Sequence, residues 1–256
     1  MIHSTAIIDP TASIADNVEI GPYTVIGANV SIAEGCVIGP HVGIKGTTTI
    51  GKANKIYQFS SIGEDPQDKK YAGETTYLEI GDNNVFREFT TINRGTEQDG
   101  GLTKIGDNNL FMAYTHVAHD CQIANDIIMA NASSVAGHVH VGSHVILGGF
   151  TIVHQFCHLG ERSFAAMGSA ITKDVPPYVM VGGTPTKPHG INSVGLERSG
   201  FSTDSIRLIK RAYKTLYKSQ LSFADAKSKL AEMADGSLEL SVMSDFLKVC
   251  ERGVIR

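Results

Sequence analysis

Residues 15–56 read ADNVEI, GPYTVI, GANVSI, AEGCVI, GPHVGI, KGTTTI and GKANKI, and each group of six ends in isoleucine. The period extends outward to Ile2 and to Ile62, so that eleven isoleucines stand six residues apart. Neither an α-helix nor a simple strand produces a period of six, whereas a parallel β-helix of hexapeptide repeats does. The sequence therefore predicts a mainly β protein whose chain winds as a prism, with three hexapeptides in each triangular coil.

The repeat continues through most of the chain. It resumes at Ile80 and, after a slip of one residue, runs from Ile105 to Ile171. Each period-six residue and the residue two before it should face inward, because side chains alternate along a strand. Three of the four cysteines fall in that second inward position, which predicts packed, reduced thiols rather than a disulfide or a metal site. These cysteines are Cys36, Cys121 and Cys157.

Two insertions interrupt the repeat and should leave the wall of the prism as loops. If the period continued through residues 63–79, Asp68 and Glu74 would face a dry core, which does not accept unpaired carboxylates. The second insertion, residues 94–104, accounts for the slip in phase. Insertions in solenoids are tolerated as decoration, but they commonly cluster on the binding face. The polar run Gln67–Lys70 favours a functional role for the first insertion.

The repeat divides the chain into three regions. Residues 1–175 should form the β-helix, residues 176–200 an irregular Gly/Pro-rich linker, and residues 201–256 a small helical domain. Ser202 or Thr203 can cap the first helix, and two more helices are expected near residues 222–235 and 237–251. Basic residues follow one face of the first helix from Arg207 to Lys218, which fits a solvated face as well as an acidic partner.

Composition and charge exclude some classes of partner. The 256 residues carry a formal net charge of −4 at pH 7, so we expect no general polyanion-binding surface and no nucleic-acid partner. No apolar stretch approaches the length needed to span a membrane, and the N-terminus has no basic region followed by an apolar stretch. We therefore expect a soluble cytoplasmic protein without stable membrane insertion.

Seven of the ten histidines lie within residues 116–158. Because residues three hexapeptides apart should stack on neighbouring coils, one outward patch near a corner should contain His119, Asp120, Gly137, His138, His154 and Gln155. An imidazole can take the proton of a sugar hydroxyl near neutral pH, and a nearby carboxylate can fix its tautomer. A glycine exposes its backbone N–H, as a donor to an oxyanion should. The patch predicts direct acyl transfer from a thioester, with no cofactor and no serine or cysteine nucleophile.

Three other interpretations stay open at this point. Exposed histidines on a β-helix can be plain surface. A hexapeptide-repeat metalloenzyme of the carbonic-anhydrase type would bind Zn²⁺ between subunits; His140 and His158 are separated by one full coil, and His116, His119 or His144 could complete such a site. A non-catalytic scaffold would present the flat walls of the prism to a partner.

Five motifs resemble those of the acyl-[acyl-carrier-protein]–UDP-N-acetylglucosamine O-acyltransferases, which begin lipid A synthesis. They are His116–Asp120 (HVAHD), Ala136–Val139 (AGHV), His154–Phe156 (HQF), Asp174–Pro177 (DVPP) and Ile56–Phe59 (IYQF), and the similarity covers essentially the whole chain. The resemblance implies a left-handed coil and a homotrimer with active sites in clefts between prisms. It also implies transfer of a 3-hydroxyacyl chain from acyl carrier protein to the glucosamine 3-hydroxyl of UDP-N-acetylglucosamine.

The resemblance also implies roles for individual residues. His119 would be the general base, Asp120 its orienting partner and the Gly137 N–H the oxyanion donor. The sugar and acyl-donor pocket would contain Asp68, Lys70, His116, His138, His154 and Gln155. Asn192 and Arg198 would hold the nucleotide diphosphate, which suits the fork of donors of an arginine. The basic helix would meet the acidic carrier protein.

This chain departs from the family pattern at three positions. Asn93 stands before Arg-Gly-Thr where a histidine is expected. Val194 and Ser199 stand where some relatives have an acid and a second arginine. These changes bear on the nucleotide contacts more than on the catalytic base.

Two further positions bear on the length of the acyl chain. Gly149 and Met167 are separated by one full coil and should stack on each other, where the resemblance places the acyl tail. In this family the second position is either a glycine, which leaves a long channel, or a bulky residue that ends the channel early. Met167 therefore predicts a medium chain of the 3-hydroxydecanoyl type over 3-hydroxymyristoyl, unless this methionine merely covers surface.

Overall fold

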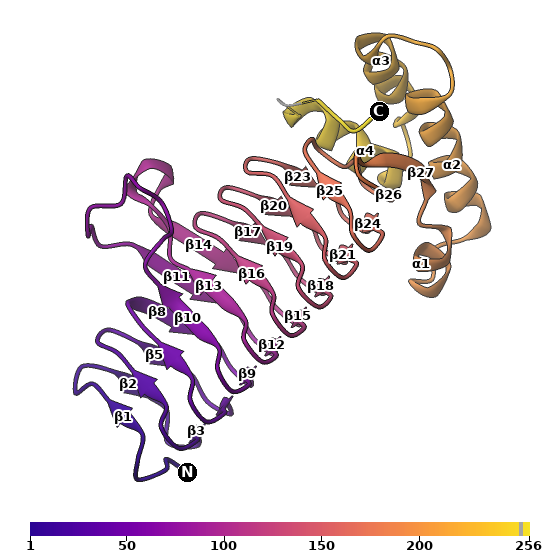
Figure 1. The fold of residues 1–256 in the computed structure, drawn as a ribbon. Helices are drawn as coiled ribbons and strands as arrows, with labels where there is room; N and C mark the ends of the chain where they lie inside the picture. The colour runs from indigo at the N-terminus through magenta and orange to yellow at the C-terminus, as the bar shows by residue number, and fades with distance from the viewer. Residues whose placement is uncertain (251–252) are drawn as a thin grey trace.

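The computed structural model describes residues 1–250 and 253–256, and it has the form of a three-walled prism of short strands with helices at one end (Figure 1). The coil is left-handed, against the usual right-handed preference of parallel crossovers. The N-terminus lies at the opposite end of the prism from the helices. Each full coil adds one strand to each of the three sheets, which confirms the predicted fold class.

The walls are defined by the following strands. The first sheet contains β1 (Ile7–Ile8), β4 (Val25–Ile26), β7 (Gly43–Ile44), β10 (Ser61–Glu64), β13 (Thr91–Asn93), β16 (His116–Val117), β19 (Ser134–Val135), β22 (Ile152–Val153) and β25 (Ala170–Ile171). The second contains β2 (Ser13–Ile14), β5 (Ser31–Ile32), β8 (Thr47–Ile50), β11 (Tyr77–Ile80), β14 (Leu102–Ile105), β17 (Gln122–Ile123), β20 (His140–Val141) and β23 (His158–Leu159). The third contains β3 (Glu19–Ile20), β6 (Val37–Ile38), β9 (Lys55–Ile56), β12 (Val85–Phe86), β15 (Leu110–Phe111), β18 (Ile128–Met129), β21 (Ile146–Leu147), β24 (Phe164–Ala165), β26 (Val179–Gly182) and β27 (Lys187–Ile191).

The core is the column of inward side chains that the period of six predicts. Outside the two insertions, strand partners are separated by three hexapeptides of sequence, as in His116 beside Ser134. The period-six side chains are buried from Ile20 to Ile171, and burying one such side chain stabilises the fold by about 1.5–3 kcal/mol. The three inward cysteines are buried free thiols, as predicted. Burial raises the pKa of Cys121 to about 12, which keeps this thiol protonated and unreactive.

Both insertions leave the wall as loops, but their bounds are narrower than predicted. The first loop, residues 65–76, joins β10 to β11, and the second loop, residues 94–101, joins β13 to β14 and contains the short 3₁₀ helix η1 (Glu97–Asp99). The expected range 63–79 was too wide because Gly63 and Glu64 still belong to β10 and residues 77–79 already belong to β11, where Leu78 is buried. The strand β11 pairs in register with β14 from Tyr77 onward.

The prediction of an irregular linker over residues 176–200 is wrong. Strand β26 pairs with β24 and extends the third sheet by one more rung, and β27 pairs antiparallel with β26. Helix α1 (Ser193–Arg198) follows directly. These elements cover the end of the third sheet, whose backbone groups would otherwise remain unpaired.

Three longer helices close this end of the molecule. They are α2 (Thr203–Tyr217), α3 (Phe223–Met233) and α4 (Leu238–Val249), close to the predicted ranges. The side chain of Ser202 caps α2 by accepting a hydrogen bond from the Ser205 N–H. The predicted end of the last helix at residue 251 lies outside the described residues. None of the helices in the described part of the chain has the length and apolar character needed to cross a membrane.

Candidate active site

One corner of the prism, between the first and second sheets, holds the predicted catalytic residues. His119 and Asp120 follow β16, and Gly137 and His138 follow β19 on the next coil. The first and second loops leave the coils directly below at the same corner, because each follows a strand of the first sheet, β10 or β13. The fold therefore brings the loops and the histidines together.

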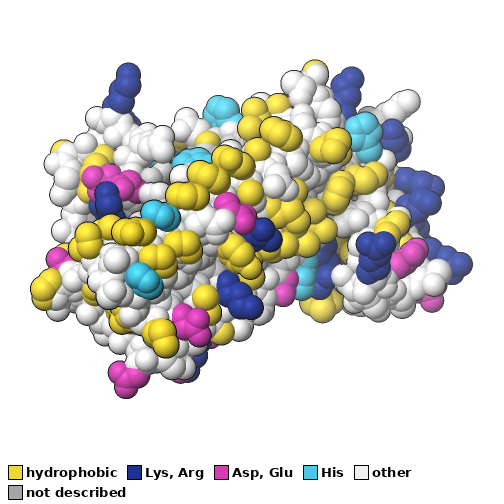
Figure 2. Space-filling model, turned by 60° about the horizontal axis from the view of Figure 1, so that its bottom comes forward, with side chains coloured by type: hydrophobic (Ala, Val, Ile, Leu, Met, Phe, Trp, Pro, Cys, Tyr) yellow, Lys and Arg dark blue, Asp and Glu magenta, His cyan; other side chains and the backbone are white. Residues whose placement is uncertain are grey.

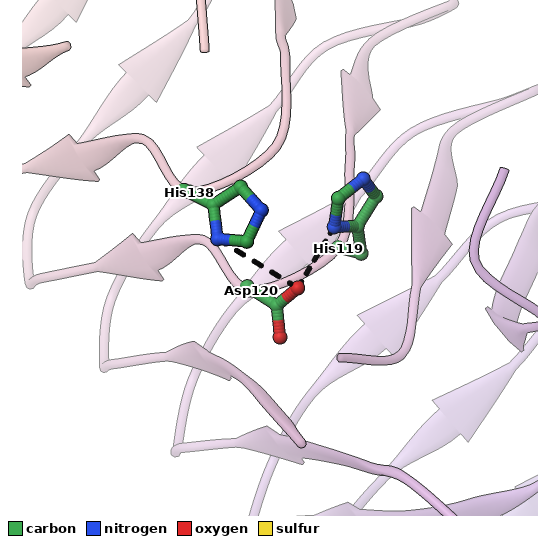
Figure 3. Close-up of side chains that lie close together, drawn as sticks. All are labelled: His119, Asp120 and His138. Atoms are coloured by element: carbon green, nitrogen blue, oxygen red, sulfur yellow. Dashed lines mark hydrogen bonds and ion pairs between the residues drawn. The ribbon is translucent and has the colours of Figure 1, made fainter. Parts of the chain in front are cut away.

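His119 and Asp120 form a hydrogen-bonded pair (Figure 3). His119 Nδ1 lies 2.8 Å from Asp120 Oδ2. Burial alone would raise the pKa of the Asp120 carboxyl, but hydrogen bonds from His119 and from Thr96 outweigh burial and lower this pKa below its ordinary value. An ionised Asp120 can only accept hydrogen bonds, so it fixes the proton of neutral His119 on Nδ1 and leaves Nε2 as an acceptor.

This pair is more enclosed than the predicted outward patch. His119 is 9% exposed and Asp120 1% exposed, because the two loops pack over the corner. Within the first loop, Asp68 approaches His119, with 3.9 Å between Asp68 Oδ2 and His119 Nε2. The buried guanidinium of Arg94 anchors the first loop by donating to the Gly63 carbonyl and to Asp65.

Gly137 lies against the ring of His119. A Cβ atom at this position would stand 2.5 Å from His119 Cε1 and 2.8 Å from Nε2, so only glycine allows this approach. Among the described residues, no acceptor takes a hydrogen bond from the Gly137 N–H. The corner therefore places a backbone N–H, suited to bind an oxyanion, beside the His119 imidazole, which is suited to act as a base.

His138 is the second imidazole of the corner. Its ring stacks on Phe156 with centroids 4.3 Å apart and meets His119 edge-on at 5.0 Å. His138 Nδ1 lies 2.7 Å from Asp99 Oδ2 and 3.8 Å from Asp120 Oδ2. Figure 3 shows the Asp120 carboxylate between the two imidazoles. The ligand atoms of these two histidines and of Asp120 lie within 4.8 Å of one another, close enough to hold a cation.

The other predicted pocket residues lie around this corner at different depths. His116 Nδ1 is 2.8 Å from Thr91 Oγ1, and burial, more than the nearby His119, lowers the pKa of His116. His154 and Gln155 are exposed one coil above Gly137. Lys70 donates to Gln98 of the second loop at 3.4 Å, next to Asp99.

The predicted nucleotide residues lie on a different wall. Asn192 and Arg198 line a hollow of about 310 Å³ beside the third sheet and α1, together with Phe164 and Val194. The Asn192 side chain is already engaged, since it caps α1 by accepting from the Gly195 N–H at 3.2 Å. One chain therefore does not bring the nucleotide residues together with His119.

The two acyl-length positions lie at a further corner, where the third sheet passes into the first. Met167 follows β24 there and is 79% exposed. This corner also carries a column of stacked rings on the lower coils, whose members are Tyr23, His41, Phe59, Phe89 and Tyr114. The exposed outer face of the first sheet, with Ile152, lies between this corner and the corner of His119.

The histidines of the metalloenzyme interpretation are distributed over several walls. The rings of His140 and His158 stack on the second sheet with centroids 4.5 Å apart. His144 lies at the next corner, 3.8 Å from Asp126. His116 belongs to the first sheet. A single chain does not assemble the predicted three-histidine set.

Sequence reasoning missed two residues of the second loop, Thr96 and Asp99. Thr96 donates to both oxygens of Asp120, and Asp99 pairs with His138. The phase of the repeat could have predicted that the second loop lies near His119, because both insertions follow strands of the same wall as His119. The side-chain contacts themselves depend on the path of the loop, which no repeat rule specifies.

Comparisons with known proteins agree along the whole chain. The profile described as UDP N-acetylglucosamine O-acyltransferase, domain 2, matches residues 174–255, and the bacterial transferase hexapeptide profile matches residues 1–34. An acyl-[acyl-carrier-protein]–UDP-N-acetylglucosamine O-acyltransferase of Thiobacillus denitrificans is 53% identical over 255 residues, covering 100% of this chain and 99% of the relative. The corresponding protein of Halorhodospira halophila is 52% identical with the same coverage.

Solved structures give the same picture. A UDP-N-acetylglucosamine O-acyltransferase from Moraxella catarrhalis is 47% identical, with a TM-score of 0.98 and coverage of 100% of this chain and 99% of the other. A UDP-N-acetylglucosamine acyltransferase from Francisella novicida is 42% identical, with a TM-score of 0.99 and coverage of 100% and 94%.

Proposed function

Since the chain belongs to the acyl-[acyl-carrier-protein]–UDP-N-acetylglucosamine O-acyltransferase family, we propose that it transfers a 3-hydroxyacyl chain from acyl carrier protein to the glucosamine 3-hydroxyl of UDP-N-acetylglucosamine, the first step of lipid A synthesis. The observation that carries the residue assignment is the His119–Asp120 pair beside the bare Gly137. It supplies a base with a defined tautomer and a backbone donor within one enclosed corner.

The reaction follows from these groups. His119 Nε2 takes the proton of the 3-hydroxyl while the hydroxyl oxygen attacks the thioester carbonyl carbon. The carbonyl oxygen becomes an oxyanion, which the Gly137 N–H stabilises. The tetrahedral intermediate then collapses, the C–S bond breaks, and the His119 imidazolium returns its proton to the departing thiolate of the carrier protein. Asp120 stabilises the imidazolium throughout.

These steps need neither a metal nor a cofactor, because the thioester is already an activated acyl donor. Asp68, which faces His119 Nε2, binds the sugar in this scheme. His116, His138, His154, Gln155 and Lys70 line the rest of the sugar and acyl-donor pocket. The positive face of α2 receives the acidic carrier protein.

The nucleotide site comes from a second copy of the chain in a homotrimer. Asn192 and Arg198 stand on the third wall, away from the corner of His119, so a neighbour must present this wall to complete the site. The exposed ring column at the corner between the third and first sheets supports such an assembly, because stacked aromatic side chains of this extent usually mark an interface. The acyl chain then lies along the outer face of the first sheet toward Met167.

The test is an acyl-transfer assay with 3-hydroxydecanoyl carrier protein and UDP-N-acetylglucosamine. His119→Ala should fold like the wild type and lose about 10²–10⁴-fold in kcat, the usual contribution of a general base. Wild-type turnover should survive a chelator, and elemental analysis should find no stoichiometric Zn²⁺. Near-normal turnover of His119→Ala would remove this residue from the role of base. Chelator-sensitive activity with bound zinc would favour the metalloenzyme alternative, and no turnover of any acyl donor would favour the scaffold.

A further inference from the structure

Thr96, in the second loop, holds both oxygens of the Asp120 carboxylate. Its backbone N–H donates to Oδ1 at 2.7 Å, and its hydroxyl donates to Oδ2 at 2.6 Å. Thr96 and Asp120 are 2% and 1% exposed, so water does not compete for these contacts. The carboxylate that faces His119 is thus also held, at both of its oxygens, by a residue of the loop.

The second loop fits closely around Asp120. A Cβ atom at Gly95 would stand 2.7 Å from Asp120 Oδ1 and 2.2 Å from the backbone nitrogen of Leu102, so the loop approaches more closely than any other residue would allow. Just beyond the loop, the hydroxyl of Thr103 accepts a hydrogen bond from the Asp120 N–H at 2.8 Å. The backbone and the side chain of Asp120 are therefore both held by this segment.

This arrangement bears on the orientation of His119. A carboxylate bound only by the imidazole could rotate and offer either oxygen. Thr96 donates one hydrogen bond to Oδ1 and one to Oδ2 of Asp120. Only Oδ2 faces His119 Nδ1, so the carboxylate is held in one rotamer toward the imidazole. Hydrogen bonds to an ionised group are the stronger class, and a small misplacement of a catalytic group reduces the rate substantially.

We propose that Thr96 is a positioning residue that acts through Asp120 on His119. The proposal rests on the proposed function of His119 as the general base. Thr96 touches no reacting atom in this scheme, since Asp120 lies between its hydroxyl and the imidazole. Its loss should therefore lower kcat and leave the binding of UDP-N-acetylglucosamine unchanged.

The experiment compares Thr96→Val with Thr96→Ser in the acyl-transfer assay. Thr96→Val removes the hydroxyl but keeps the branched shape, and we expect kcat to fall about 10- to 100-fold, as for loss of a hydrogen bond to a charged group. The KM for UDP-N-acetylglucosamine should stay within about twofold, because a group that acts only in the transition state leaves ground-state binding unchanged. Thr96→Ser should restore most of kcat. Thr75→Val, on the exposed part of the first loop, is the matched control.

A double-mutant cycle separates a role through Asp120 from a general effect on the loop. In the Asp120→Asn background, Thr96→Val should change kcat by less than about twofold, because residues that act as one unit are not additive. An additive loss, a rise in KM alone, or an equal loss in Thr96→Ser would overturn the proposal. Thr96→Ala provides the same readout if valine does not fold.

Failure of this inference can be told apart from failure of the proposed function. If His119→Ala and Asp120→Asn turn over normally, the assigned base is wrong, and the role of Thr96 falls with it. If both are impaired while Thr96→Val has wild-type kcat, the base stands and only the positioning role of Thr96 is refuted.

Discussion

At the scale of single residues, the side chains at the corner of His119 are aligned by a left-handed backbone conformation. Asp120, His138 and Phe156 all lie in the left-handed region, with φ values of 59°, 62° and 62°. Asp and His tolerate this region better than most other residues do. The conformation recurs every six residues along these coils, so it returns to this corner once in each full coil. It thereby aligns the three side chains in one column, and His138 stacks on Phe156. A corner of the repeat thereby becomes a row of functional groups.

Met167 carries the residue-scale prediction on acyl length. It is exposed at the corner between the third and first sheets, beyond Ile152 on the proposed acyl path. Each buried methylene contributes about 0.8 kcal/mol, so a 3-hydroxymyristoyl chain whose last four methylenes are blocked would lose about 3 kcal/mol of binding. The wild type should therefore have a higher kcat/KM for 3-hydroxydecanoyl carrier protein.

Met167→Gly should shift this preference toward 3-hydroxymyristoyl carrier protein, by up to about a hundredfold in the ratio of kcat/KM values. Met167→Leu, which keeps the bulk, should leave the ratio near that of the wild type. Two outcomes would show that Met167 does not set the preferred acyl length. The wild type could already prefer the longer donor, or Met167→Gly could leave the ratio unchanged.

At the scale of elements, helix α2 presents a cluster of basic side chains. Arg207, Lys210, Arg211 and Lys214 line one hollow of about 630 Å³ with Asp204 as the only acid among its lining residues. Figure 2 shows Lys and Arg side chains gathered over the helical end, whereas the prism carries hydrophobic patches with charged and His side chains scattered among them. Asp204 pairs with Arg207 at 3.0 Å, which leaves the other three cations available for an acidic partner.

Charge reversal on α2 tests whether this face receives the carrier protein. The double variant Lys210→Glu/Arg211→Glu should raise the KM for acyl carrier protein about tenfold or more, with the KM for UDP-N-acetylglucosamine unchanged. The wild-type KM for the carrier should also rise with salt, since exposed charges are screened. The double variant Lys229→Glu/Lys248→Glu, on α3 and α4, makes the same change in net charge at two other exposed cations and serves as the control. Equal effects of the two sets of substitutions would indicate a response to net charge and not a docking face.

At the scale of the whole molecule, the prism separates residues that the proposed reaction uses together. His119 stands at the corner between the first and second sheets, and Arg198 stands beside the third. Asp68, in contrast, lies next to His119 of its own chain, so the first loop closes the site from within one subunit. In the proposed trimer, the residues that a neighbour supplies are therefore the nucleotide residues and not the first loop.

Subunit mixing tests this arrangement. His119→Ala and Arg198→Ala should each be impaired as pure proteins, because every site lacks one component. After exchange in equal amounts, about one quarter of the interfaces in a cyclic trimer should combine an intact His119 with an intact Arg198 from the neighbour. The mixture should regain activity in that proportion. No gain after exchange, confirmed by mass spectrometry of mixed trimers, would place both residues in one subunit's site or rule out the shared cleft.

The sequence by itself determined the coil and most of its contents. The period of six can be read directly from the sequence, and it specifies which residues face inward and which stack on neighbouring coils. His119 therefore stacks with Gly137, and Asp120 with His138. The capped helix after Ser202 could be predicted for the same reason, since its signals are local.

Only the tertiary structure decided what covers the corner. The paths of the two loops depend on contacts between segments far apart in the chain, such as Thr96 with Asp120 and Asp99 with His138. These contacts turned part of an expected outward patch into a buried pair, and they joined Lys70 of the first loop to Gln98 of the second. Strand β26 likewise arose where a linker was expected, because the last open edge of the third sheet needed a hydrogen-bonding partner. Repeat periodicity fixes the stacking of coils, whereas loop packing and sheet termination are settled by long-range contacts that no local pattern encodes.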